Sequence, residues 1–276
     1  MVRGINREVF RIRFHRSMAQ RIALNPYTLI PPDEPLILII DALWFNRERG
    51  TLKGYCCYTI LVRPVSHTHA IVIDILLRRS SETRWVWERI INRLPRSLQK
   101  RVVALIADGC RGIAHLAHDR GWYFQWCHVH VKRKISELRG VRNLPGKSLR
   151  REATRYIYSF LETADTHEAD QCLVRIASLF ANPLCPHSIR TRLSAIVKRP
   201  HLFRAYRAVP RFNLPVTTNS AEYIHSRIRA FLAQSRGISS SRAMRLWLAI
   251  IHHECLIVSC RGYQETLPAE HRISLS

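Results

Sequence analysis

Three acidic residues have the type and the setting to hold divalent metal ions: Asp41, Asp108 and Glu222. Asp41 directly follows the apolar run 36–40, and Asp108 directly follows a second apolar segment, 101–107. Such runs are typical of strands buried on both faces, beside which an isolated carboxylate is costly. Either aspartate alone is equally well explained as a turn residue. Together they indicate a site at the carboxyl ends of two strands, where open α/β sheets bind ligands.

Glu222 is predicted to lie on a helix of residues 220–234, which the sequence Thr-Thr-Asn, ending at Asn219, precedes as a cap. Its neighbours three, four and seven residues along the helix are His225, Ser226 and Arg229. Because this face is polar, it need not be buried in the core and could reach across to the strand ends.

Three such acids suit phosphodiester transfer, in which metal ions help to cut and join nucleic acid strands. Two metal ions about 3.5–4 Å apart stabilise both the attacking and the leaving oxygen of an in-line displacement. Mg²⁺ prefers hard oxygen ligands and is usually held by a few carboxylates together with water and substrate phosphates. Asp41, Asp108 and Glu222 are therefore candidate ligands for two Mg²⁺ ions, with Mn²⁺ able to substitute.

The elements that must position these acids follow from hydrophobic periodicity. Strands are predicted at residues 36–40, 55–62, 70–77, 101–107 and 122–127. The first three are consecutive and separated by turn signals, so they are expected to be antiparallel, and the others belong to βα units. The predicted fold is α/β, with a mixed five-stranded sheet and flanking helices.

Helices are expected over residues 85–94, around His115 and His118, and over 130–139. After Gly140 the pattern becomes helical for a long stretch, which predicts an all-helical insertion before the last acid. The later helices are predicted at 151–164, 168–181, 188–206, 220–234 and 241–259.

The charge of the chain favours a polyanionic partner. Lys and Arg number 44 against 20 for Asp and Glu, which gives a formal net charge of +24. Nucleic acid is the usual partner of such a field. The basic residues that flank the expected site are candidates for phosphate contacts: Lys132, Arg133, Lys134, Arg227 and Arg229.

Other partner classes are disfavoured by the sequence. No apolar run approaches the roughly 20 residues of a membrane span, and no secretory leader is recognisable. The eight cysteines form no Cys-x-x-Cys pair, so neither a zinc ribbon nor a disulfide framework is indicated. We expect a reducing, cytoplasmic location.

Four segments in this order carry a family resemblance: 39–43 (Ile-Ile-Asp-Ala-Leu), 106–109 (Ile-Ala-Asp-Gly), 125–130 (Gln-Trp-Cys-His-Val-His) and 217–222 (Thr-Thr-Asn-Ser-Ala-Glu). The chain resembles the DDE transposases of bacterial insertion sequences, in particular the Mutator-like group. The resemblance covers about residues 34–260. It implies a ribonuclease-H-like catalytic core, interrupted by the helical insertion, with Asp41, Asp108 and Glu222 as the catalytic acids.

The resemblance also implies supporting residues and an organisation of the chain. Cys127 and His130 match the Cys-x-x-His motif of that group, and Asn219 precedes the last acid, so all three are expected to support the site. The implied segments are a basic N-terminal segment (1–33), core (34–140), helical insertion (141–215), core-completing helices (216–260) and tail (261–276). The N-terminal segment is short for a DNA-binding region of this family, of which it would be a remnant.

By the same resemblance, the expected function is metal-dependent DNA cleavage and strand transfer in transposition. The partners are then transposon ends and target DNA, with a homo-oligomer in the DNA complex and no membrane. The implied location is the bacterial cytoplasm, in association with the nucleoid. Two alternatives remain open: another ribonuclease-H-like nuclease, and a transposase-derived DNA-binding protein without catalysis.

Overall fold

The computed structural model describes residues 25–45, 54–110, 112–137, 146–234 and 241–260. They divide into two compact units, which are described separately below. Unit 1 comprises residues 1–102 and 219–276, and unit 2 comprises residues 103–218. None of the described helices is both long and apolar enough to cross a membrane.

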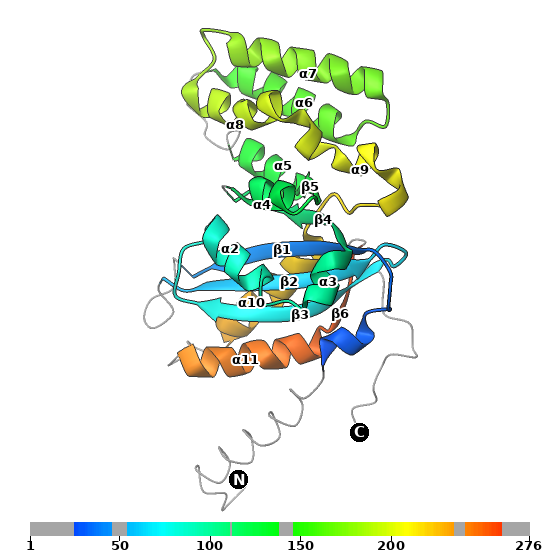
Figure 1. The fold of residues 1–276 in the computed structure, drawn as a ribbon. Coiled ribbons are helices and arrows are strands. Elements are labelled where there is room, and N and C mark those ends of the chain that lie inside the picture. The colour runs from blue at the N-terminus through cyan, green and yellow to red at the C-terminus, as the bar shows by residue number, and fades with distance from the viewer. Residues whose placement is uncertain (1–24, 46–53, 111, 138–145, 235–240, 261–276) are drawn as a thin grey trace, which may run out of the picture. The chain divides into compact units, whose positions relative to one another are not determined.

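Four antiparallel strands form the sheet of unit 1, in the order β1-β2-β3-β6 (Figure 1). Their bounds are β1 (Leu36–Trp44), β2 (Cys56–Pro64), β3 (His69–Arg78) and β6 (Ile257–Ser259). Every residue of β2 is buried, as expected for a strand covered on both faces.

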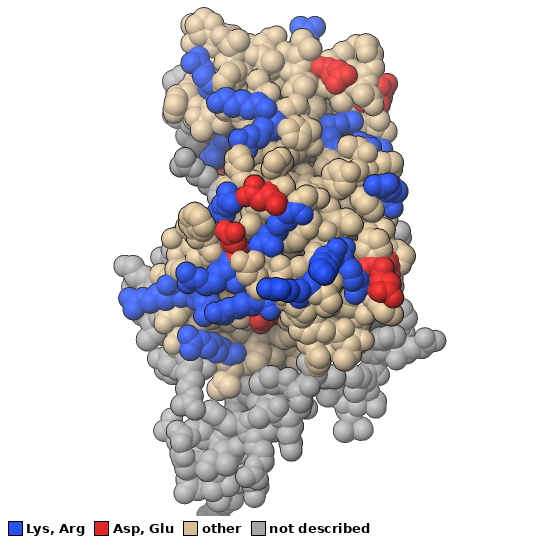
Figure 2. Space-filling view, viewed as in Figure 1, with Lys and Arg blue, Asp and Glu red and all other residues tan. Residues whose placement is uncertain are grey.

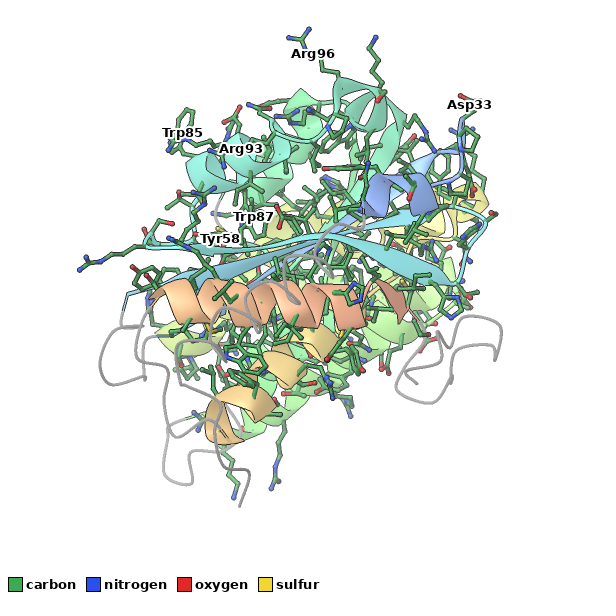
Figure 3. The ribbon with its side chains drawn as sticks, turned by 90° about the horizontal axis from the view of Figure 1, so that it is seen from below. Asp33, Tyr58, Trp85, Trp87, Arg93 and Arg96 are labelled. Carbon is green, nitrogen blue, oxygen red and sulfur yellow. The ribbon has the colours of Figure 1, made fainter. Side chains whose placement is uncertain are left out.

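Helices cover both faces of this sheet (Figure 3). Adjacent β2 residues show the two sides, because side chains alternate along a strand. Tyr58 packs edge-on against Trp87 of α2, whereas Thr59 bonds His225 of α10. One face therefore carries α2 (Arg84–Ile91) and α3 (Arg96–Arg101), and the other carries α10 (Asn219–Gln234) and α11 (Ser241–Glu254). The short helix η1 (Pro26–Leu29) contacts β3.

Unit 2 begins with a parallel βα arrangement. Strands β4 (Val102–Ala107) and β5 (Tyr123–Trp126) pair in parallel and are joined by α4 (Ile113–Asp119). Helix α5 (His128–Ser136) follows β5 directly.

A helical block makes up the rest of unit 2. Its helices are α6 (Lys147–Glu162), α7 (Thr166–Ala181), α8 (His187–Lys198), η2 (Pro200–Phe203), α9 (Ala205–Ala208) and η3 (Pro210–Phe212). Helices α6, α7, α8 and η2 pack with α5 around one apolar cluster, which includes Ile157, Phe160, Ile176, Leu193 and Phe203. The amphipathic periodicity that predicted these helices thus reflects a shared core.

The α/β class and the mixture of antiparallel and parallel strands are confirmed, but three local predictions are wrong. The expected helix 188–206 ends at Lys198, because Pro200 removes a backbone donor and starts η2. The expected helix 241–259 ends at Glu254, and its last residues form β6. That sixth strand pairs with β3, so six strands are described in place of five.

The third correction concerns Asp41. Its strand was expected to end at this residue, but β1 continues to Trp44 and pairs with β2 along its whole length. Asp108, by contrast, does follow the last residue of β4. The two units divide the chain after residues 102 and 218. The predicted tail, 261–276, lies outside the described residues.

Candidate functional site

Asp41 is a buried carboxylate in the middle of β1, with only 2% of its surface exposed. One carboxylate oxygen, Oδ1, accepts a hydrogen bond from the backbone N–H of Ala42 at 2.9 Å. In the antiparallel register Asp41 lies directly opposite Thr59 of β2, so both side chains lie on the same face of the sheet.

His225 of α10 contacts both of these residues. Its Nε2 lies 3.1 Å from Oγ1 of Thr59, and its Nδ1 lies 3.7 Å from Oδ2 of Asp41. The imidazole is itself 3% exposed, so these contacts are shielded from solvent. His225 therefore links the helix to both strands and helps to fix the position of the Asp41 carboxylate.

Apolar packing explains why α10 presents His225 to the sheet. Ala221 and Ile228 are fully buried and lie four and three residues from His225, on the same face of the helix, and the fully buried Ile224 directly precedes it. The helix contacts both β1 and β2. The polar face of the helix is therefore buried at His225, because its apolar neighbours pack against the sheet.

Glu222 lies in the first turn of α10, three residues before His225, and is half-buried. It therefore projects next to His225 on the helix surface, one turn nearer the start of α10. Within unit 1, the fold brings Asp41 and Glu222 to the same side of the sheet, the side covered by α10. Asn219, expected as part of the cap, is the first residue of the helix.

Asp108 belongs to unit 2 and begins the loop between β4 and α4. Its Oδ1 accepts a hydrogen bond from the backbone N–H of Cys110 at 3.1 Å, and its carbonyl oxygen accepts one from Trp126 Nε1 at 2.9 Å. The first bond is an Asx turn and the second ties the loop to β5. The half-buried side chain is thus held at a defined position in its own unit.

Gly109 allows this loop to pass beneath Trp126. Its φ is +87°, and a Cβ built there would lie 1.9 Å from Trp126 Nε1. Trp126 has little room to move, because its ring stacks on Phe203 with the centroids 4.6 Å apart. The Asp-Gly pair is therefore required by local geometry as well as by any chemistry of Asp108.

We expect Gly109→Ala to lower the free energy of unfolding by about 3 kcal/mol, from backbone strain plus overpacking. Gly121→Ala is the matched control, since Gly121 also has a positive φ, +69°, but open space around it. That variant should lose only about 1 kcal/mol, the backbone part alone. Urea unfolding measures both. Equal losses would show that Trp126 does not restrict the Gly109 position.

The Cys-x-x-His motif forms a local network around the buried Cys127 thiol. Its Sγ lies 3.3 Å from His130 Nδ1 and accepts hydrogen bonds from the backbone N–H and the hydroxyl of Thr218, at 3.3 and 3.4 Å. Thr218 is the residue directly before α10. Cys127 therefore fastens the start of α5 to Thr218, the last residue of unit 2.

His128, which lies between Cys127 and His130 in the sequence, belongs to the core of unit 2. Its Nε2 lies 2.7 Å from the carbonyl oxygen of Phe203, and burial lowers the pKa of its imidazole to about 4. Gln125 Nε2 donates to the same carbonyl at 3.0 Å, and Gln125 Oε1 accepts from the backbone N–H of Tyr206. These contacts indicate a structural role for the Gln-Trp-Cys-His sequence.

The five basic residues expected near the site fall into two groups. Lys132 pairs with Glu162 and lies 5.0 Å from the ring centroid of Tyr158, and Arg227 bonds Glu254 at 3.2 Å. These two cations thus have carboxylate partners within their own units.

The other three differ in exposure: Arg133 and Arg229 are exposed, and Lys134 is half-buried. Arg133 and Arg229 are therefore the better placed for phosphate contacts.

Two contributors to the site were not predicted from the sequence. Thr59 is a buried polar residue of β2, and its position between Tyr58 and Ile60 is a signal that the sequence carries. The sequence places His225 next to Glu222 on the helix but does not indicate its contacts with Thr59 and Asp41. Searches against protein-family models and against curated proteins found no match to this chain.

Proposed function

We propose that this chain is a DDE transposase, which cleaves DNA and joins the freed ends to target DNA through a ribonuclease-H-like catalytic core. The observation that carries the proposal is the buried carboxylate of Asp41, facing the helix that bears Glu222. A buried acid is costly, and an enzyme gains from one where a metal ion compensates its charge.

Asp108 supplies the third acid of the proposed set. Its loop is fixed by the Asx turn at Cys110 and by the indole of Trp126, which favours a preorganised ligand. The donors are carboxylate oxygens, a hard set that suits Mg²⁺ or Mn²⁺. Bound there, such ions would neutralise the charge that develops on the attacked phosphate.

The residues of the chain then have distinct tasks in the proposed reaction. Asp41, Asp108 and Glu222 hold the ions, and His225 positions the carboxylate of Asp41. Water attacks the phosphodiester at an element end and breaks the bond to the leaving 3′ oxygen, which departs as a hydroxyl. That hydroxyl then attacks a phosphate of the target DNA and displaces a 3′ oxygen of the target strand, which leaves as a hydroxyl, so no covalent bond to the protein is needed. Arg133 and Arg229 contact strand phosphates.

The net charge of +24 supports a DNA substrate over a small phosphate ester. The order of the four motifs and the helical block between Asp108 and Glu222 support a transposase over a simpler nuclease of this fold. In the same proposal, two or more copies assemble on the DNA ends.

The experiment that tests the proposal incubates the purified chain with Mg²⁺, target DNA and labelled DNA from the borders of its own reading frame. Cleaved ends joined to the target are expected. Cleavage without any joining would favour the nuclease alternative. DNA binding without cleavage, in Mg²⁺ and in Mn²⁺, would favour the binding protein without catalysis. Either result would overturn the transposase assignment.

A further inference from the structure

A basic surface with an exposed tryptophan lies on the other side of the unit 1 sheet. We define this α2–α3 surface by Trp85, Arg89, Arg93 and Arg96. All four side chains are exposed, Trp85 to 73%. Figure 3 shows Trp85 and Arg96 on the outer side of α2 and α3, away from α11.

The amphipathicity of α2 explains why these residues face outward. Trp87, Ile90 and Ile91 are buried against the sheet, and Trp87 contacts Tyr58 of β2. Trp85 and Arg89, four residues apart, are neighbours on the opposite face of the helix. Packing in the core therefore explains Trp87, whereas Trp85 remains exposed to solvent.

Packing does not explain an indole that is almost three-quarters exposed. Leu184 and Val174 are also exposed, but they lie on the helical block of unit 2, without a comparable aromatic ring. Trp85 is accompanied by a cation, since the guanidinium of Arg84 lies 5.7 Å from its ring centroid. An exposed aromatic ring among arginines is the combination that stacks on bases while guanidinium groups hold phosphates.

The positive charge of this surface is compensated only in part, at Arg93, which acts electrostatically on the carboxyl group of Asp74. Within the described residues, none of Arg89, Arg93 and Arg96 forms an ion pair. The nearby acid Glu82 accepts hydrogen bonds from the indoles of Trp44 and Trp87, so its carboxylate faces the core. Figure 2 shows lysine and arginine side chains gathered over α2 and α3, with few acidic ones between them.

We propose that the α2–α3 surface binds single-stranded DNA, with an unpaired base stacked on Trp85 and the backbone phosphates held by Arg89, Arg93 and Arg96. Single strands fit better than duplex, because a base can stack on a tryptophan only when it is not already paired. A membrane surface fits less well, since α2 has only eight residues and its remaining large apolar side chains face the sheet.

This surface is separate from the proposed catalytic acids of unit 1. Tyr58 points towards α2 and its neighbour Thr59 points towards His225 and Asp41, so the sheet lies between the two sites. A strand on the α2–α3 surface is therefore a different segment from one cut at Asp41. The inference concerns binding and goes beyond the proposed catalysis; only the choice of DNA over RNA rests on that function.

The test measures binding of a fluorescently labelled single-stranded DNA oligonucleotide to the full chain over a range of salt concentrations, without divalent metal. Trp85→Ala should weaken binding about tenfold without changing the salt dependence, and Trp85→Phe should restore most of it. The triple variant Arg89→Gln, Arg93→Gln, Arg96→Gln should reduce the slope of log K against log salt by about 2.

The matched control is the triple variant Arg151→Gln, Arg175→Gln, Arg192→Gln, which removes the same charge from exposed positions on α6, α7 and α8. It should change the slope much less. Equal effects of the two triple variants, or no effect of Trp85→Ala, would overturn the inference. An equal loss on blunt duplex DNA would also overturn it, because paired bases cannot stack on Trp85.

Two further arms identify the ligand. Tighter binding of an RNA oligonucleotide of the same sequence would overturn the choice of DNA. Trp85-dependent binding to phosphatidylserine vesicles, with none to the oligonucleotide, would assign the surface to a membrane and overturn the proposal. A chain that binds DNA through Trp85 but never cleaves it would contradict the proposed catalysis and leave this inference standing.

Discussion

Asp41→Asn is expected to lower the rate of metal-dependent DNA cleavage about a thousandfold, while metal-free DNA binding stays unchanged. Asparagine keeps the shape of the side chain but removes the negative charge that attracts a hard cation. A loss of several kcal/mol of electrostatic stabilisation in the transition state corresponds to about three powers of ten in rate. Asp108→Asn and Glu222→Gln should behave alike, because all three acids serve the same ions.

The control for Asp41→Asn is Asp74→Asn. Asp74 lies on β3 of the same sheet, is half-buried, and has its pKa raised by burial, although His252 acts in the opposite direction. It has no place in the proposed site, so its variant should cleave at the wild-type rate. Thermal unfolding of both variants checks that they fold. Wild-type cleavage by folded Asp41→Asn would exclude this carboxylate as a metal ligand.

The sequence predicts the elements that depend on local interactions and misses those that depend on contacts between distant residues. Strands β2 and β3 of unit 1 and helices α6 and α7 of unit 2 were predictable because burial imposes a local period on each segment. The limit of β1 was not predictable, because an acid directly after an apolar run indicates the end of a strand. In fact the pairing of residues 42–44 with β2 carries the strand onward and makes the aspartate a central residue.

The end of the chain shows the same limitation. The segment after Glu254 is apolar enough to continue α11, and only its pairing with β3 makes it a strand. Its partner residues, such as Ala70 opposite Val258, are far away in the sequence, so no local pattern predicts the pairing. Pro200 was different, because a proline that ends a helix is a local signal.

The sequence indicates the candidate acids, but it does not indicate which side chains contact them. Asp41, Asp108 and Glu222 were selected from their flanking residues, whereas the contact of His225 with Thr59 joins residues 166 positions apart. The network of Cys127 and Thr218 likewise spans 91 positions. Local sequence indicates which residues can do chemistry, and tertiary packing decides which residues hold them in place.

His225→Ala is expected to lower the free energy of unfolding by about 4 kcal/mol and to slow cleavage strongly. The substitution leaves a cavity. It also removes the imidazole that contacts the buried Asp41 carboxylate and the Thr59 hydroxyl. Removing one member of a buried polar or charged pair typically costs about 3–5 kcal/mol, because the remaining group stays desolvated. Urea unfolding measures the loss, and the DNA cleavage assay measures the rate.

A double-mutant cycle distinguishes a positioning role of His225 from ordinary packing. If His225 acts through the charge of Asp41, then His225→Ala should cost about 1–3 kcal/mol less in the Asp41→Asn background than in the wild type. His252→Ala is the control, because His252 bonds the carbonyl oxygen of Val72 at 2.8 Å and does not contact Asp41. It should show additive behaviour with Asp41→Asn. Additivity of His225→Ala as well would mean that the histidine fills space and does not hold the carboxylate.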